Sequence, residues 1–220
     1  MPAKNKALTI WLALILLLIS LMVVVGGLTR LTHSGLSIVD WRPIMGALPP
    51  LSESDWQETF DKYKKFPEYQ RRISDMTLAD FKSIYWWEYS HRLLGRVIGI
   101  AFLIPWLYFW IRKRIPSGYN VKLGALFVFG ALQGVLGWFM VQSGLIDNPQ
   151  VSHYRLAAHL ALAFLLFGAT LWVILALREV PRSPASTPRI RAVTRGITAL
   201  ISLQVIYGAL TAGLKGGYVL

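Results

Sequence analysis

The stretch Trp86–Gly99, WWEYSHRLLGRVIG, opens an apolar segment long enough to cross a membrane, yet it carries ionisable side chains at its start. Helical spacing places Glu88, His91, Gly95 and Gly99 on one face. Ionisable groups at such a depth are costly in a bilayer, so they indicate a function or an internal partner. A carboxylate, an imidazole and a groove without side chains would suit a flat, metal-containing ligand such as haem. The alternative is a polar helix end bonded to lipid headgroups.

The composition predicts an integral membrane protein. The chain has 220 residues, of which 55% are hydrophobic, and its mean hydropathy is +0.48. The net charge of +12 does not indicate nucleic acid, because the basic residues gather in short segments between apolar runs. The absence of cysteine excludes disulfides, thiolate nucleophiles and cysteine-held metal clusters. Four histidines and five methionines are left as ligands for a soft or borderline metal.

Five segments have the length and apolarity of a membrane-spanning helix: about residues 7–29, 88–111, 121–142, 154–177 and 194–214. The fold class is therefore an all-α integral membrane protein. Basic residues before the first helix, between the second and third, and between the fourth and fifth fall on one side, which the positive-inside rule makes cytoplasmic. The N-terminus is then cytoplasmic. The first apolar run is too long for a signal-peptide core and is expected to be a retained helix.

The chain divides into a predicted four-helix transmembrane bundle over residues 1–180, a cytoplasmic linker at 181–193, and a fifth helix within 194–220. The external loop at about 30–86 alternates prolines with amphipathic stretches and is expected to form a cap of short helices. Gly26–Thr29 matches Gly208–Thr211 in a weak repeat. The repeat and the odd helix count suggest a fragment of a duplicated architecture, with the second half only begun.

A second histidine is predicted to lie opposite the first. His159 follows Arg155 by four residues near the start of the fourth predicted helix. This helix and the one with His91 both run inward, so both imidazoles are expected roughly 5–8 Å below the outer boundary. Two histidines on parallel helices of a bundle can ligate one iron from opposite faces. Arg92, Arg96 and Arg155 are suited to haem propionates.

Other interpretations of these residues stay open. A zinc site needs three or four ligands, and only two histidines and Glu88 are available at this depth. A proton or ion relay through the same groups is a further interpretation, and so are interhelical hydrogen bonds of purely structural value. His33 and His153 are expected at the membrane edges, His33 as a solvated loop residue.

Four stretches together resemble the haem A synthase family, in its mitochondrial and proteobacterial branch. They are VVGGLTRLTHSGLSIVDWRPIMGALPPLS (Val24–Ser52), FKSIYWWEYSHRLLGRVIG (Phe81–Gly99), LQGVLGWFMVQSGL (Leu132–Leu145) and VSHYRLAAHL (Val151–Leu160). The resemblance implies an eight-helix protein of two similar halves, each with a histidine pair. It implies one pocket for a haem b cofactor and another for the substrate haem O. It also implies an oxidoreductase that converts a haem methyl to a formyl group by successive hydroxylations, giving haem A for cytochrome c oxidase.

By position, the resemblance assigns His91 and His159 to the substrate-side pair and a catalytic role to Glu88. A carboxylate beside the porphyrin edge could relay protons or stabilise a cationic intermediate. The loop cysteine pair of some branches is absent, as are helices six to eight. The expected partners are haem O, membrane lipids, an electron donor, haem O synthase, oxidase assembly factors and a second copy of the chain, in a bacterial inner membrane. The alternatives are a b-type haem electron-transfer subunit and a haem-free transporter or assembly scaffold.

Overall fold

The computed structural model describes residues 3–41, 45–178 and 187–216, and within these ranges every regular element is a helix. Five helices are long and apolar enough to cross a membrane, as the sequence predicts. They are α1 (Ala3–Leu31), α4 (Leu78–Ile111), α5 (Tyr119–Gln142), α6 (His153–Leu177) and α7 (Pro188–Gly213). The all-α class is confirmed.

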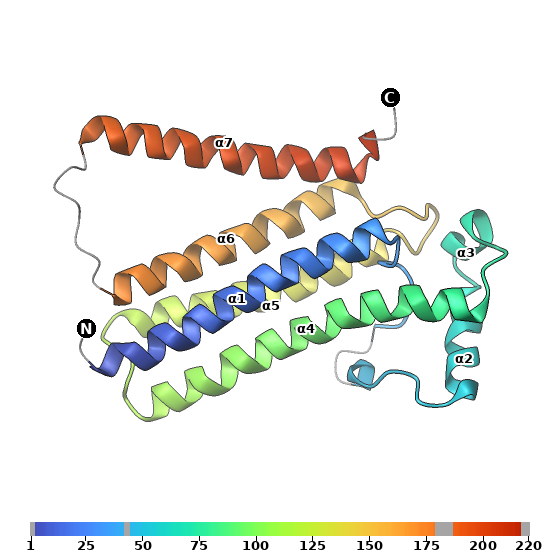
Figure 1. Ribbon diagram of the computed structural model, residues 1–220, viewed down its shortest axis with the longest axis horizontal. Helices are drawn as coiled ribbons and strands as arrows, with labels where there is room; N and C mark the ends of the chain where they lie inside the picture. The colour runs from blue at the N-terminus through green and yellow to red at the C-terminus, as the bar shows by residue number, and fades with distance from the viewer. Residues whose placement is uncertain (1–2, 42–44, 179–186, 217–220) are drawn as a thin grey trace.

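Four of these helices close into a ring. α1 contacts α4 and α6, and α5 contacts the same two helices, so α4 and α6 face each other across the ring. Figure 1 shows α4 and α6 running in the same direction, antiparallel to α1 and α5. α7 lies outside the ring, along α6 and antiparallel to it (Figure 1).

The apolar core occupies only one half of the bundle. Its buried members come from the first half of α1, the second halves of α4 and α6, and the start of α5: Leu8, Trp11, Leu12, Ile15, Phe102, Phe109, Leu123, Leu126, Leu166, Val173, Ile174 and Leu177. Trp11 anchors this half, because its ring packs on Phe102 and Phe109 and its Nε1 donates to the carbonyl of Ala101 at 2.9 Å. The other half of the bundle, which contains both predicted histidine ligands, lies beyond this core.

A cap of short helices covers that other end. It contains η1 (Met45–Ala47), α2 (Glu53–Tyr63) and α3 (Pro67–Arg72), and Figure 1 shows α2 and α3 grouped at one end of the molecule. α2 begins with a capping box between Ser52 and Asp55. Its aromatic face, Trp56, Phe60 and Tyr63, packs against Phe81, Tyr85 and Tyr89 of α4.

α4 begins earlier than the second predicted span. A capping box of Thr77 and Asp80 starts one continuous helix of 34 residues at Leu78, so the end of the 30–86 loop and the predicted membrane helix are one element. No proline interrupts it before Pro105, and Phe81, Tyr85 and Tyr89 recur at four-residue spacing to bind α2. The extension therefore carries the cap.

α7 also begins earlier than expected, at Pro188 rather than about 194. Thr187 is its N-cap and accepts from the backbone N–H of Ile190 at 3.3 Å, and proline suits the first helical turn. The last residues of the proposed 181–193 linker are therefore helical, while its first part lies outside the described residues, as does Gly217, which matches Gly35 in the internal repeat.

Candidate functional site

His91 lies against a glycine of the neighbouring helix. A Cβ placed on Gly26 of α1 would lie 3.2 Å from Nε2 of His91 and 3.6 Å from its Cδ2. Any larger residue at this position would have to displace the ring. The adjacent Gly27 has no such neighbour within 4 Å. Gly95, predicted to open a groove beside His91, is instead approached by Met22 of α1, at 3.4 Å from an added Cβ, whereas Gly99 is open.

His159 has the same kind of contact on the opposite side of the ring of helices. A Cβ on Gly137 of α5 would lie 3.0 Å from its Cε1. Its Nδ1 is buried and, within the described parts of the chain, has no hydrogen-bond partner. Gln133, one turn earlier on α5, donates from Nε2 to the backbone carbonyl of His159 at 2.9 Å.

The two imidazoles lie at one level of the bundle. Gly26 is five residues before the end of α1, and Gly137 is five residues before the end of α5. His159 is the seventh residue of α6, so each of the three lies roughly 7–9 Å from the cap end of its helix. The structure thus brings His91 and His159 to the same depth on helices that face each other.

Glu88 is the most buried ionisable side chain beside these histidines, at 2% exposed. Its Oε2 accepts hydrogen bonds from Oγ of Ser37 and the backbone N–H of Ile38, each at 2.8 Å. Its Oε1 accepts from Arg92, at 3.0 Å from Nε and 2.6 Å from Nη2. Both carboxylate oxygens therefore have partners, and they fix the segment that follows α1 onto α4.

The arginines predicted for propionates have protein partners. Arg92 donates to the carbonyl of Ile38 at 2.7 Å as well as to Glu88. Arg96 donates to the carbonyl of Arg92 at 3.0 Å. Arg155 donates to the carbonyl of Phe139 at 2.7 Å and lies 3.5 Å above the centre of the Phe139 ring. These contacts use only some of the five N–H donors of each guanidinium, and the others can bind a carboxylate.

The remaining histidines lie at helix ends. His33 is exposed, in the turn after α1, and has a positive φ of 54°. His153 is the first residue of α6, where its ring packs on Tyr154. Among the described residues, no group of three or more histidine, aspartate or glutamate side chains is arranged to hold a metal ion. A metal ion held by His91 and His159 would therefore need further ligands from another source. The nitrogens of a porphyrin are such ligands.

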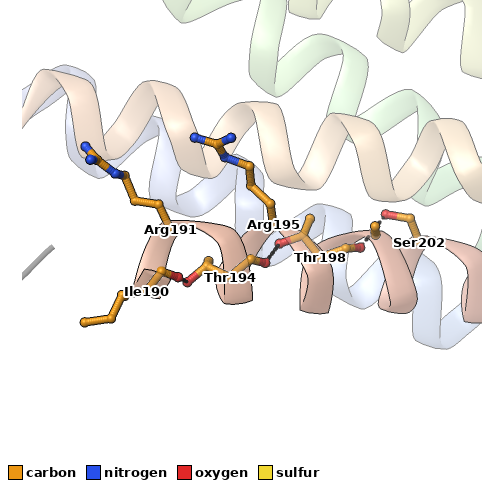
Figure 2. Close-up of a pocket in the computed structure, with 7 residues that line it drawn as sticks. Ile190, Arg191, Thr194, Arg195, Thr198 and Ser202 are labelled. Carbon is orange, nitrogen blue, oxygen red and sulfur yellow. Dashed lines mark hydrogen bonds between the residues drawn. The ribbon is translucent and has the colours of Figure 1, made fainter. Parts of the chain in front are cut away.

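A shallow depression elsewhere belongs to α7 alone. Figure 2 shows its lining, with Arg191 and Arg195 extended on the same side of the helix. The hydroxyls of Thr194, Thr198 and Ser202 each donate to a carbonyl one turn earlier. It contains no histidine or acidic residue, and it is separate from the site around His91 and His159.

Comparison with known proteins identifies the family. Residues 9–220 match the family model described as cytochrome oxidase assembly protein. The chain belongs to this family.

Curated relatives of the family carry the name heme A synthase. The protein of Nitrosospira multiformis is 49% identical over 98% of this chain and 61% of its own length. The protein of Parvibaculum lavamentivorans is 50% identical over 99% of this chain and 63% of its own length. The protein of Flavobacterium psychrophilum is 50% identical over 98% of this chain and 64% of its own length. The chain thus spans less than two thirds of the length of these relatives. No solved structure matches it.

The sequence alone missed three features of this site. Ser37 and Ile38 lie about 50 residues before their partner Glu88, and no local spacing connects them. Gly26 stands out in the sequence only through the internal repeat, and Gly137 only as one of four glycines on the third predicted span, yet each lies against a histidine ring. Both glycines fall within the last six residues of a predicted span, 7–29 or 121–142, and this was the signal available in the sequence.

Proposed function

We propose that this chain is the N-terminal, haem-binding portion of a haem A synthase, in which His91 and His159 ligate the iron of a haem. The observation that carries the proposal is the pair of histidines at one level on facing helices, each against a glycine. Family membership and the name of its relatives supply the reaction: oxidation of a haem methyl group to a formyl group, giving haem A for cytochrome c oxidase.

The residues present fit a haem by two tests. Nδ1 of His159 is a buried ring nitrogen without a partner, and such a group is unfavourable unless a hydrogen bond or a ligand orders the ring. The glycines leave room where any other residue would crowd the rings. When bound, the iron porphyrin supplies the redox chemistry. The chain would supply the two histidines and the half of the bundle that lies beyond the buried apolar core.

Glu88 is proposed as the acid–base group at the edge of this site. It lies one helical turn before His91 and accepts hydrogen bonds from Ser37, Ile38 and Arg92. A carboxylate beside the porphyrin edge could accept a proton from a reacting group. Arg92, Arg96 and Arg155 are proposed to bind the haem carboxylates through their other N–H donors.

The setting of the proposal is a bacterial inner membrane with the N-terminus in the cytoplasm. The basic ends of the helices on that side and the bacterial origin of the relatives support it. The division into a bundle at 1–180, a linker and the start of a second half is part of the same proposal. Haem O is then the substrate, an electron donor completes the reaction, and haem O synthase, oxidase assembly factors or a second copy of the chain are the partners.

The test is spectroscopic and chemical. The purified chain, expressed with a source of haem O, is expected to show a six-coordinate low-spin haem spectrum that His91→Ala and His159→Ala each abolish. Wild-type spectra in both variants would refute the ligand assignment. Mass spectrometry of the extracted haem then tests the reaction, since haem O without any oxidised product would leave a haem-binding subunit that does not modify its haem.

A further inference from the structure

Gln133 connects α5 to α6 at the residue that carries the second imidazole. Its Nε2 donates to the backbone carbonyl of His159 at 2.9 Å. A carbonyl oxygen only accepts hydrogen bonds, so the amide nitrogen has to face it, and this settles the orientation of the amide. The side-chain oxygen Oε1 is then directed elsewhere. It is buried and has no hydrogen-bond partner among the described residues.

The second buried group without a partner is on the residue that Gln133 contacts. Nδ1 of His159 is buried and unpaired within the described ranges, and these two atoms are the buried side-chain N and O atoms in that condition. One group is an acceptor, and the other is a donor in one of the two imidazole tautomers. Buried polar groups are rarely left unpaired in proteins, and these two complementary groups belong to residues already joined by a hydrogen bond.

We propose that Gln133 is the positioning residue of His159: its Oε1 accepts a hydrogen bond from Nδ1–H and so leaves Nε2 free to bind iron. The inference rests on the proposed ligation of haem by His159. Metal-binding histidines usually donate their other N–H to a carbonyl or carboxylate, which fixes both the tautomer and the orientation of the ring.

The contact between His159 and Gly137 explains why the bond is within reach. Cε1, which lies between the two ring nitrogens, is the atom nearest to Gly137, and Nδ1 lies 3.7 Å from the position of an added Cβ. A glycine here lets the ring turn towards Gln133, which is one turn away on the same face of α5. The hydrogen bond from Nε2 of Gln133 to the backbone carbonyl of His159 keeps the Gln133 amide in place while the imidazole turns.

The strength of this bond sets the electron density on the imidazole, so the reduction potential of the haem reports it independently of turnover. Gln133→Glu places a stronger acceptor at Nδ1 and is expected to lower the potential. Gln133→Leu removes the acceptor and is expected to raise it, and to weaken haem binding by about 10–100-fold. The order Glu, Gln, Leu is a signature that loss of packing alone would not produce.

The experiment is a redox titration and a haem-binding titration of the purified chain and its variants in detergent. Gln204→Leu, the same change on an exposed part of α7, is the matched control and is expected to leave both quantities unchanged. If Gln133→Leu does not fold, Gln133→Glu, which keeps the volume and an acceptor, decides alone. Wild-type potentials in the Gln133 variants that fold would overturn the inference and leave haem ligation intact. A wild-type chain that binds no haem would overturn the proposed function and the inference with it.

Discussion

Arg92 donates two hydrogen bonds to Oε1 of Glu88, one turn earlier on α4, at 3.0 Å from Nε and 2.6 Å from Nη2. The pair is largely withdrawn from solvent, with side chains 15% and 3% exposed. The same guanidinium donates to the carbonyl of Ile38, while Glu88 accepts from the N–H of Ile38. The ion pair therefore joins α4 to the segment that follows α1, in addition to any role in proton transfer.

Replacing Glu88 by glutamine is expected to destabilise the protein as well as to stop turnover. The change leaves the charge of Arg92 buried without its counterion and presents an amide to the donors of Ser37 and Ile38. Breaking a buried pair in this way costs about 3–5 kcal/mol. Unfolding of the chain in mixed micelles measures the loss, and product analysis measures turnover.

The control is Glu58→Gln, which removes an exposed partner of Lys62 on α2 and is expected to cost less than about 1 kcal/mol. A second comparison adds Arg92→Met. If the pair acts as described, the double variant loses less stability than the two single variants together. Unaltered stability of Glu88→Gln would contradict the structural role, and unaltered product yield would remove Glu88 from the mechanism.

The contacts of Glu88 show which parts of the site the sequence can predict. Helical spacing places Glu88 and His91 on one face, and the structure puts both near the cap end of α4. The spacing does not show that both oxygens of Glu88 are already bonded, because two of the donors, Ser37 and Ile38, lie on a non-helical segment far away in the chain. Such pairings depend on how that segment folds over the helix, which periodicity does not encode.

Gly137→Ala is expected to disturb His159 with little effect on the fold. The added methyl would lie 3.0 Å from Cε1 of the ring, closer than an ordinary contact, so the imidazole has to move. We expect a shifted haem spectrum and weaker haem binding, by about tenfold or more. Gly134→Ala on the same helix has no neighbour within 4 Å and is the matched control, with unchanged haem binding and equal or better helix stability. Identical spectra in the two variants would argue against a ligand at His159.

Gly26→Ala makes the corresponding test of His91 from α1. Here the added methyl would lie 3.2 Å from Nε2 of His91. The expected result is a fall in haem content of the purified chain, while Gly27→Ala, with open space around its Cβ, keeps the wild-type content. Haem per chain, from absorbance and protein assay, is the measurement. Equal haem content in both variants would place the haem away from His91.

Helix lengths show a second limit of the sequence. Hydropathy located all five spans, but it began the second and fifth too late, because residues 78–87 and 188–193, which precede the apolar runs, are held in the helix by caps and, in α4, by packing. The sequence predicted short helices in the 30–86 loop, whereas the end of that loop is the first part of α4 and packs against the aromatic face of α2. Local patterns identify an amphipathic face, and tertiary contacts decide how far the helix extends.

Gly213→Ala is expected to loosen α7 from the bundle. A Cβ at Gly213 would lie 2.4 Å from Cβ of His153 at the start of α6, too close for either helix to keep its position. Arg30 of α1 donates to the carbonyl of Ala212 at the same crossing, so this contact would be strained as well. Protease cleavage between α6 and α7, or hydrogen exchange of α7, is expected to increase. Gly208→Ala, with nothing within 4 Å, should behave as wild type, and similar protection of α7 in both variants would refute the close crossing.

The last prediction concerns pH and the cap. Burial raises the pKa of Glu68, on α3, from 4.5 to about 7, and the negative charge of Glu88 adds to the increase. The Tyr63 hydroxyl, which donates to Glu68, and the cations Arg72 and Lys215 oppose it. Between these two pH values the folded cap retains a proton that the unfolded chain releases. The contribution of protonated Glu68 to the free energy of unfolding is therefore fully present below pH 4.5 and is lost as pH rises through about 7. The total loss is about 2–3 kcal/mol.

Glu68→Gln keeps the shape of the protonated side chain and removes its titration. The variant is expected to match wild type at pH 5 and to exceed it at pH 8, measured as hydrogen exchange of α2 and α3 or as unfolding in mixed micelles. Glu53→Gln, on the exposed first turn of α2, is the control and should leave the wild-type pH dependence in place. If wild type and Glu68→Gln lose stability equally between pH 5 and pH 8, the carboxyl of Glu68 is not the group that titrates, because its removal must flatten that part of the curve.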